Sequence, residues 1–292
     1  MLQAIKNFPK QFEYKPRIEN FRKWKKFNKF VVAGMGGSHL AADLLKVWQP
    51  DFDVVVHSDY GVPSSIKGRL MIANSYSGNT EETIDALRTV LKKNVSAAVI
   101  ATGGKLIELA KKNNLPYIQM PNIGIQPRAA LGFNLRALLK MMGEETGLKE
   151  TARLRILPVN KFEKDGKRLA RKFLKYTPVI YSSAVNAPLA YNWKIKFNET
   201  GKKPAFCHTF PELNHNEMTG FERGGYRFAF IFLQDTDDHP KILKRMKTCR
   251  KLYQDRGYLV EVVDLRGRSV WEKIFRCLLL ADWTSYYTAI MT

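Results

Sequence analysis

The sequence predicts an α/β protein of two domains, each a parallel sheet flanked by helices in a three-layer αβα arrangement. Two observations support this prediction. Short apolar runs alternate with longer runs of helical periodicity, a pattern typical of strand and helix units around a parallel sheet. The alternation also occurs twice, on either side of a polar, charge-rich stretch at 143–167. We therefore expect domains at 1–150 and 151–292, with two halves that look like a weak internal duplication.

The first half supplies five predicted strands and four predicted helices. The strands are KFVVAG (29–34), FDVVVH (52–57), RLMIAN (69–74), SAAVIA (96–101) and PYIQM (116–120). Helices are expected to begin after Ser38, Gly78, Gly104 and Pro127. A basic, aromatic segment at 1–30 precedes the first strand.

The second half repeats the pattern with four more runs of strand type. These are TPVIYSS (177–183), KPAFCH (203–208), YRFAFIFL (226–233) and YLVEVVD (258–264). Helices are predicted from Ala187 to Phe197, around Leu213, across the basic stretch 241–256, and from Ser269 onward.

The net charge of +21 is the strongest signal in the composition. A basic chain attracts polyanions and phosphorylated metabolites alike, so the charge does not choose between them. In the stretch 241–256 the basic residues interleave with apolar ones at helical spacing, which favours the solvated face of a helix. The sequence shows no stacking or groove-reading motif, so we do not expect nucleic-acid binding.

Several classes of protein and site are not expected from the composition. No apolar run approaches the roughly 18 residues of a membrane span, so a soluble protein is predicted. The N-terminal segment lacks the apolar core of a signal peptide and carries Glu13 and Glu19, which indicates a cytoplasmic protein. Three dispersed cysteines suit neither a disulfide framework nor a CxxC metal site and are expected to be packing residues. The five histidines are not clustered, so no metal is implied.

A glycine-rich turn, GMGGSHLAADLL at 34–45, follows the first predicted strand. Gly36 and Gly37 allow the backbone to approach a ligand, and Ser38 stands where it could cap the next helix. The alternative is a dinucleotide site, for which Asp53 has about the spacing of a ribose-binding acid. Against that alternative, GxGxxG requires glycine at position 39, where this chain has His39.

A second polar loop, SYSGNTEET at 75–83, follows the third predicted strand directly. Ser75, Ser77 and Thr80 are short hydroxyl donors beside the positive end of a helix, and could surround a phosphate without a metal. An ordinary capped helix would explain Thr80 and the glutamates, but not the two serines with glycine. Two such loops at successive strand ends favour a phosphate site.

Together with PRAALG and FNETGKKPAFCHTFPELNHNEMTGFE, these loops resemble the sugar isomerase (SIS) fold, and within it the bifunctional phosphoglucose/phosphomannose isomerase family. The resemblance extends from about residue 20 to the end. It implies two SIS-type domains and interconversion of glucose 6-phosphate, and possibly mannose 6-phosphate, with fructose 6-phosphate through a cis-enediol. It implies neither a metal nor a cofactor.

The resemblance also implies roles for three residues. Glu199 in NETGK matches the base that moves a proton between C1 and C2 of the sugar. Arg128 in PRAALG matches an arginine near the reacting oxygens, where its permanent charge can only stabilise an anion. His215 in ELNHNE matches a ring-opening histidine that the family contributes from the neighbouring subunit, so a homodimer is expected.

The sequence departs from the family at its end. Family members carry a lysine in a final helix that completes the site, and no lysine follows Lys273 here. The resemblance therefore leaves two expectations open, a truncated C-terminal helix or the loss of that group. The functional alternative to an isomerase is a phosphosugar-binding regulator or a degenerate isomerase that lacks full turnover.

Overall fold

The computed structural model describes residues 1–20 and 27–292 and divides the chain into two compact units. The first, here called the amino-terminal unit, spans Lys6–Leu157. The second, the carboxy-terminal unit, comprises Pro158–Thr292 together with Met1–Ile5. Part of the predicted basic N-terminal segment, residues 21–26, lies outside the described residues.

The amino-terminal unit is built on a five-stranded parallel sheet with the strand order β2-β1-β3-β4-β5. The strands are β1 (Phe30–Ala33), β2 (Val54–His57), β3 (Leu70–Asn74), β4 (Ala97–Ala101) and β5 (Tyr117–Gln119). All residues of β1, β3 and β4 are buried. Continuous burial is expected when helices cover both faces of a parallel sheet. The five strands coincide with the five predicted apolar runs, so that prediction is confirmed.

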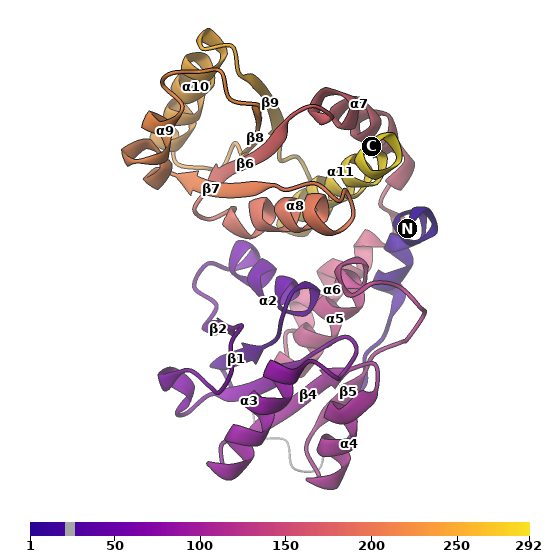
Figure 1. Cartoon of the computed structure of the whole chain (residues 1–292). Helices are drawn as coiled ribbons and strands as arrows, with labels where there is room; N and C mark the ends of the chain where they lie inside the picture. Colours follow the sequence, from indigo (N-terminus) through magenta and orange to yellow (C-terminus); the bar gives the residue numbers. More distant parts are fainter. Residues whose placement is uncertain (21–26) are drawn as a thin grey trace. The chain divides into compact units, whose positions relative to one another are not determined.

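Helices cover both faces of this sheet (Figure 1). Those of the amino-terminal unit are α2 (Gly37–Trp48), α3 (Glu81–Lys92), α4 (Gly104–Lys112), α5 (Leu131–Met142) and α6 (Glu145–Ala152), with 3-10 turns η1 (Phe8–Glu13), η3 (Ser64–Ile66), η4 (Pro127–Ala129) and η5 (Arg153–Ile156). Apolar side chains of α3 and α4 form one core with β1, β3 and β4. Helices α2 and α5 pack together on the opposite face.

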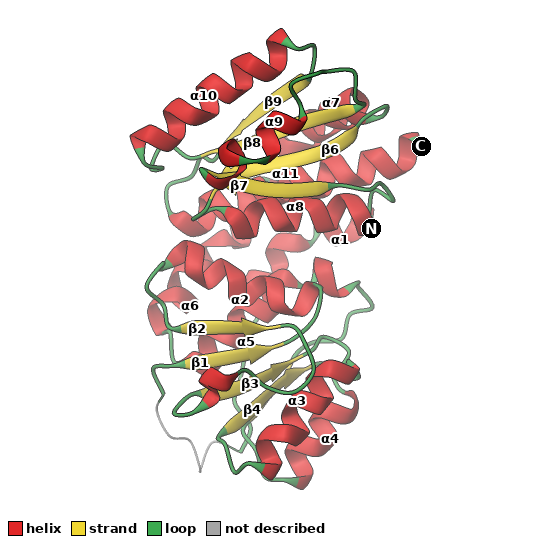
Figure 2. Ribbon diagram, turned by 60° about the vertical axis from the view of Figure 1, so that its left-hand side comes forward, coloured by secondary structure: helices red, strands yellow, loops and turns green. Residues whose placement is uncertain are grey.

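The carboxy-terminal unit repeats this architecture around four parallel strands in the order β7-β6-β8-β9 (Figure 2). The strands are β6 (Thr177–Ser183), β7 (Phe206–Phe210), β8 (Phe228–Gln234) and β9 (Leu259–Asp264), as predicted from the four apolar runs. The helices assigned here are α1 (Leu2–Lys6), α7 (Glu163–Phe173), α8 (Ala187–Glu199), α9 (Glu217–Gly220), α10 (Pro240–Asp255) and α11 (Val270–Met291), with 3-10 turns η6 (Val159–Phe162) and η7 (Glu212–His215).

The helices of the carboxy-terminal unit divide between the two faces of its sheet. Helix α11 packs against both α7 and α8, and α8 contacts β6 and β7. Helix α10 and the turn η7 share the other face, where Met246 and Leu213 join an aromatic core that includes Tyr181 and Phe230. Both units are therefore three-layer αβα structures, as the sequence predicts.

Some local expectations need correction. The prediction that a helix begins after Ser38 is wrong by two residues, because α2 begins at Gly37. The helix expected around Leu213 is a 3-10 turn followed by the four-residue α9. The last helix begins as expected, because Ser269 is its N-cap and its side chain accepts a hydrogen bond from the Glu272 amide.

Two further expectations were that the cysteines are packing residues and that no segment spans a membrane. Cys249 and Cys277 are buried and reduced, and burial raises the pKa of each to about 12, which suits packing residues. Cys207 is half-buried on β7. Among the helices of the described residues, none is both long and apolar enough to cross a membrane.

Candidate functional site

Three hydroxyl groups gather at the carboxyl end of β3. The Ser75 hydroxyl lies 2.8 Å from that of Thr80 and 3.4 Å from that of Ser77. It also accepts a hydrogen bond from the Gly78 amide at 3.1 Å. Ser75 is buried whereas Ser77 is exposed, so Ser75 organises the loop and Ser77 is open to a ligand.

The amino terminus of α3 adds a positive partial charge to this cluster. Thr80 is the N-cap residue, but its side chain makes no capping hydrogen bond. Its hydroxyl is instead paired with that of Ser75. A simple capped helix therefore does not account for the loop, and the first-turn amides of α3 keep their capacity to bind an anion.

Glycine at position 78 lets the loop press against the next one along the sheet. Gly78 has φ 73°, and a Cβ atom there would lie 1.9 Å from the carbonyl oxygen of Gly103. The Gly78 carbonyl accepts from Leu106 at 3.0 Å, and the Asn79 side chain accepts from the Lys105 amide at 3.0 Å. Any larger residue at 78 would separate the two loops.

The glycine-rich turn after β1 contacts the same loop through Ser38. Its predicted capping role is wrong, because Gly36 is the N-cap residue and Ser38 lies inside α2. The buried Ser38 hydroxyl instead accepts a hydrogen bond from the Tyr76 amide at 3.0 Å. Its carbonyl accepts from the Asn74 side chain at 2.7 Å. Ser38 therefore joins the two predicted phosphate loops.

The backbone of Arg128 lies directly against the glycine-rich turn. A Cβ atom on Gly37 would lie 2.6 Å from the Arg128 amide nitrogen, so only glycine permits the close approach. Gln11 fixes the same segment, since its side chain donates to the Ala129 carbonyl at 2.6 Å and accepts from the Gly132 amide at 2.9 Å. The half-buried Arg128 is thus held at the edge of the glycine turn.

The amino-terminal unit therefore brings together all seven of its predicted site residues, which are Gly36, Gly37, Ser38, Ser75, Ser77, Thr80 and Arg128. The sequence analysis missed the buried side chains of Asn74, Asn134 and Gln11 that support them. Asn74 donates to Asn134 at 2.8 Å beneath the loops. Asn74 could have been noticed in the sequence, because it is a polar residue at the end of an apolar run. Nothing in the sequence around Gln11 indicates its supporting role.

Glu199 is the last residue of α8 and is exposed. The chain turns directly after it, with the amides of Thr200 and Gly201 both donating to the Lys196 carbonyl at 3.0 Å. The Lys196 ammonium forms a buried ion pair with Asp282 of α11. This pair fixes the helix end that carries Glu199.

His215 closes the turn η7 and is also exposed. The neighbouring Glu217 anchors this segment, because the Tyr181 hydroxyl donates to it at 2.6 Å and His208 lies 4.0 Å from it. Within the carboxy-terminal unit, η7 packs on the α10 face of the sheet and α8 on the other face. Glu199 and His215 therefore lie on opposite faces of that sheet.

The dinucleotide alternative fails on the position of Asp53. This residue precedes β2, at the amino ends of the parallel strands, where it pairs with Arg69. The glycine turn lies at the carboxyl end of β1. A ribose-binding acid would have to lie at the same edge as the glycines.

The structure also bears on metal chemistry. Within residues 1–20 and 27–292, no group of three or more His, Cys, Asp or Glu side chains is arranged to hold a metal ion.

Known proteins resemble this chain over most of its length. Residues 162–292 match the family model of the bacterial phospho-glucose isomerase C-terminal SIS domain. A bifunctional phosphoglucose/phosphomannose isomerase from Caldicellulosiruptor bescii is 34% identical, over 100% of this chain and 93% of the relative. One of the same name from Aquifex aeolicus is 30% identical, over 98% and 91% of the two chains.

A similar fold occurs in a solved structure of much lower sequence identity. The C-terminal domain of glucosamine-fructose-6-phosphate aminotransferase from Francisella tularensis superposes with a TM-score of 0.72. The two chains are 16% identical, and the match covers 99% of this chain and 95% of the other. At that identity the likeness establishes the fold alone.

Proposed function

Because this chain belongs to the bifunctional phosphoglucose/phosphomannose isomerase family, we propose that it interconverts glucose 6-phosphate, and mannose 6-phosphate, with fructose 6-phosphate. The observation that carries the proposal is the cluster of Ser75, Ser77 and Thr80 hydroxyls beside the uncapped start of α3. We further propose that the two compact units correspond to the two expected SIS domains.

The amino-terminal unit is proposed to hold the substrate phosphate. Ser77 and Thr80 supply hydroxyl donors, and Ser75 keeps them in place. The turn at Gly36, Gly37 and Ser38 brings further backbone amides to the same edge of the sheet. Neutral donors and a helix dipole bind a phosphate dianion without requiring a metal.

Glu199 is proposed as the base that moves the proton between C1 and C2. Abstraction at C2 of the aldose gives a cis-enediol, and return of the proton to C1 gives the ketose. Arg128 is proposed to stabilise the negative charge that develops on the oxygens, because a guanidinium keeps its charge throughout. The buried Lys196–Asp282 pair supports this role for Glu199 by fixing the end of α8.

His215 is proposed to open the sugar ring from the neighbouring subunit of a homodimer. Its exposure at the end of η7 and its position on the other face of the sheet from Glu199 support a contribution to the partner's site. A closed two-fold dimer would then carry two equivalent sites.

A coupled assay tests the activity directly. Fructose 6-phosphate is supplied without added metal, and glucose 6-phosphate and mannose 6-phosphate are read separately with their own coupling enzymes. Formation of both products that is insensitive to chelators is the expected result. Tight binding of fructose 6-phosphate without turnover would instead favour the alternative, a phosphosugar-binding regulator or degenerate isomerase.

Mixing two inactive variants tests the dimer. If His215 acts across the interface, Glu199→Gln and His215→Ala chains should complement each other after subunit exchange. Half of the dimers would then be mixed with one intact site each, so about a quarter of wild-type activity should return. No recovery, with differently tagged chains co-purifying as mixed dimers, would place His215 in the site of its own chain.

A further inference from the structure

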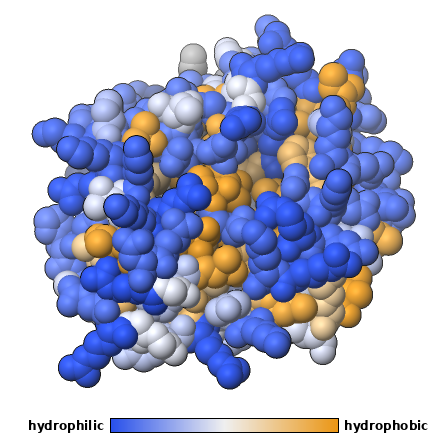
Figure 3. Space-filling view, turned by 90° about the horizontal axis from the view of Figure 1, so that it is seen from above, coloured by the Kyte–Doolittle hydropathy of each residue, from blue (hydrophilic) through white to orange (hydrophobic). Residues whose placement is uncertain are grey.

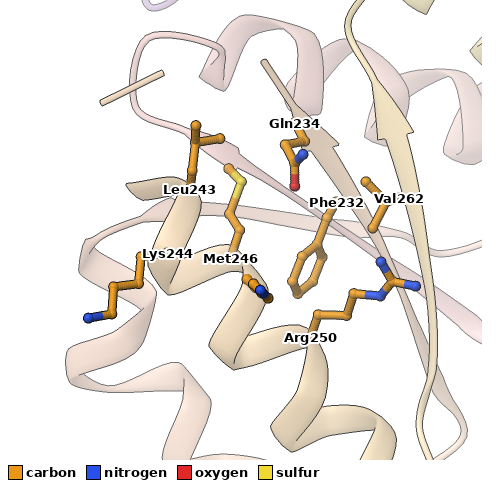
Figure 4. A pocket seen from close by; sticks show the side chains of 8 residues that line it. Phe232, Gln234, Leu243, Lys244, Met246, Arg250 and Val262 are labelled. Carbon is orange, nitrogen blue, oxygen red and sulfur yellow. The ribbon is translucent and has the colours of Figure 1, made fainter. Parts of the chain in front are cut away.

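A groove on the α10 face of the carboxy-terminal unit plays no part in the proposed isomerisation. It has a volume of about 480 Å³ and lies between α10 and the strands β8 and β9 (Figure 4). The lining residues are Phe232, Gln234, Leu243, Lys244, Met246, Lys247, Arg250 and Val262. Helix α8, which carries Glu199, packs on the other face of this sheet.

The floor of the groove is apolar. Phe232 and Val262 are register partners on β8 and β9, so their side chains lie next to each other on the same face of the sheet. Phe232 and Met246 are buried, whereas Leu243 and Val262 are half-buried and remain accessible. Figure 3 shows that the molecule, seen from above, has a hydrophobic hollow surrounded by hydrophilic side chains.

The rim of the groove is cationic. Lys244, Lys247 and Arg250 are all exposed and occupy every third position of α10. Each step of three residues advances about 4.5 Å along a helix, so the three positions span roughly 9 Å of the helix axis. No acidic residue belongs to the lining, and Asp264, opposite Gln234 in the register, is paired with Arg266 at 2.6 Å.

From this geometry we infer that the groove binds a nucleoside di- or triphosphate. The accessible floor at Leu243 and Val262 takes the base, and the Gln234 amide at the end of β8 offers a donor and an acceptor to its edge. The row of three cations takes the phosphate chain, which is longer than a single phosphate. The volume lies within the roughly 300–1,000 Å³ of small-molecule sites.

The cationic rim and the apolar floor of the groove together favour a nucleotide over simpler anions. A sugar phosphate has neither a flat apolar body for the floor nor a second phosphate for the row of cations. Inorganic triphosphate can pair with the three cations but has no group for the apolar floor. Adenosine can contact the floor but has no phosphate for the cations. A nucleotide should therefore bind more tightly than either part.

Calorimetry on the full chain with ADP and ATP tests the inference. Glucose 6-phosphate is kept saturating so that the sugar-phosphate loops are occupied, and about 0.15 M salt suppresses weak surface attraction. ATP is expected to bind at least tenfold more tightly than adenosine or inorganic triphosphate. Binding that disappears with glucose 6-phosphate, or triphosphate binding equal to that of ATP, would overturn the inference.

Variants of α10 locate the site. Lys247→Glu with Arg250→Glu should weaken ATP at least tenfold. The matched pair Lys241→Glu with Lys251→Glu makes the same charge change at exposed positions of α10 outside the lining, and should change affinity less than twofold. Equal losses in both pairs would mean that net charge alone attracts the nucleotide.

A further variant tests the apolar floor. Leu243→Glu places a carboxylate there and should weaken both ATP and adenosine, with thermal unfolding checking that the variant is folded. Unchanged adenosine affinity in the folded variant would contradict the assigned position of the base. If ATP does not bind, and Lys247→Glu with Arg250→Glu instead abolishes binding of an acidic peptide in the calorimeter, the groove takes a protein partner and the inference is also wrong.

Discussion

The two units share a topology but differ at the edge where a parallel sheet usually binds its ligand. The order β2-β1-β3-β4 corresponds to β7-β6-β8-β9, so the strands β1 and β3 are equivalent to β6 and β8. The loops after β1 and β3 carry glycines and hydroxyls. In the other unit, β6 ends at Ser183 and Asn186 follows in the next loop, whereas the loop after β8 carries Asp235, Asp237 and Asp238.

In the carboxy-terminal unit, its own carboxylates occupy this edge. Asp238 accepts hydrogen bonds from the Asn186 side chain and from the Asp235 amide, both at 3.3 Å. Lys273 of α11 pairs with Asp235 at 2.8 Å and Asp237 at 2.5 Å. Carboxylates of the unit's own loops therefore lie at the strand ends that correspond to the proposed phosphate site of the other unit. The loop residues, and not the fold alone, decide whether such an edge attracts an anion.

The proposed function assigns phosphate binding to the amino-terminal unit and the base to the carboxy-terminal unit. Glu199→Gln gives the sharpest test, because the amide keeps the shape of the side chain and removes its basicity. We expect kcat to fall by roughly 10²–10⁴-fold. Calorimetry should find sugar-phosphate affinity nearly unchanged. Glu222→Gln, at an exposed acid of the same unit, is the control; wild-type turnover in Glu199→Gln would remove Glu199 from the role of base.

Ser77→Asp places in the amino-terminal unit the kind of charge that the carboxy-terminal unit already has. Two like charges about 4 Å apart repel by roughly 4 kcal/mol at the effective dielectric of a protein surface, so sugar-phosphate affinity should fall at least a hundredfold. Ser96→Asp makes the same change at an exposed position before β4, at the opposite edge of the sheet, and should have little effect. Similar affinities of the two variants would show that the phosphate binds elsewhere.

Ser75→Ala combined with Ser77→Ala removes hydroxyls without adding charge. A hydrogen bond to a charged group contributes roughly 1.5–3 kcal/mol, so affinity should fall by about one to two orders of magnitude. Free phosphate and sugar phosphates should weaken in parallel when titrated in the calorimeter. If only the sugar phosphates weaken, these hydroxyls contact the sugar and not the phosphate.

The smallest expected effect concerns the pH dependence of stability at Asp238. Burial raises the pKa of this carboxyl above its ordinary 3.8, and hydrogen bonds from Ser183 and from the Asp235 amide offset the increase only in part. As pH rises, the unfolded chain therefore ionises Asp238 before the folded chain does, and the free energy of unfolding decreases through the folded pKa.

Asp238→Asn cannot ionise, so its free energy of unfolding should rise relative to wild type between about pH 4 and pH 7. Urea titrations at the two pH values measure this difference. Asp255→Asn, at an exposed acid at the end of α10, serves as the control. A difference that decreases with pH would mean that the carboxylate is stabilised by its partners rather than penalised by burial.

The fold class and all nine strands of the described residues could be predicted from the sequence. Strands buried on both faces need continuous apolar runs, and helices need apolar residues at helical spacing, so both patterns are local. The hydroxyl cluster was also predictable, because Ser75, Ser77 and Thr80 lie within one short loop. The prediction from residue type was wrong at Ser38, which was expected to cap a helix. Its hydroxyl instead accepts a hydrogen bond from the amide of Tyr76, in the loop after another strand.

Which distant side chains meet could not be predicted and is known from the three-dimensional structure. Gln11 reaches Ala129, and Gly37 lies against Arg128, through contacts between segments about a hundred residues apart along the chain. The hydrogen bond between Asn186 and Asp238, and the groove beside α10, arise in the same way. Such contacts depend on how crossover helices pack on the sheet, and residue spacing along the chain does not encode that packing locally.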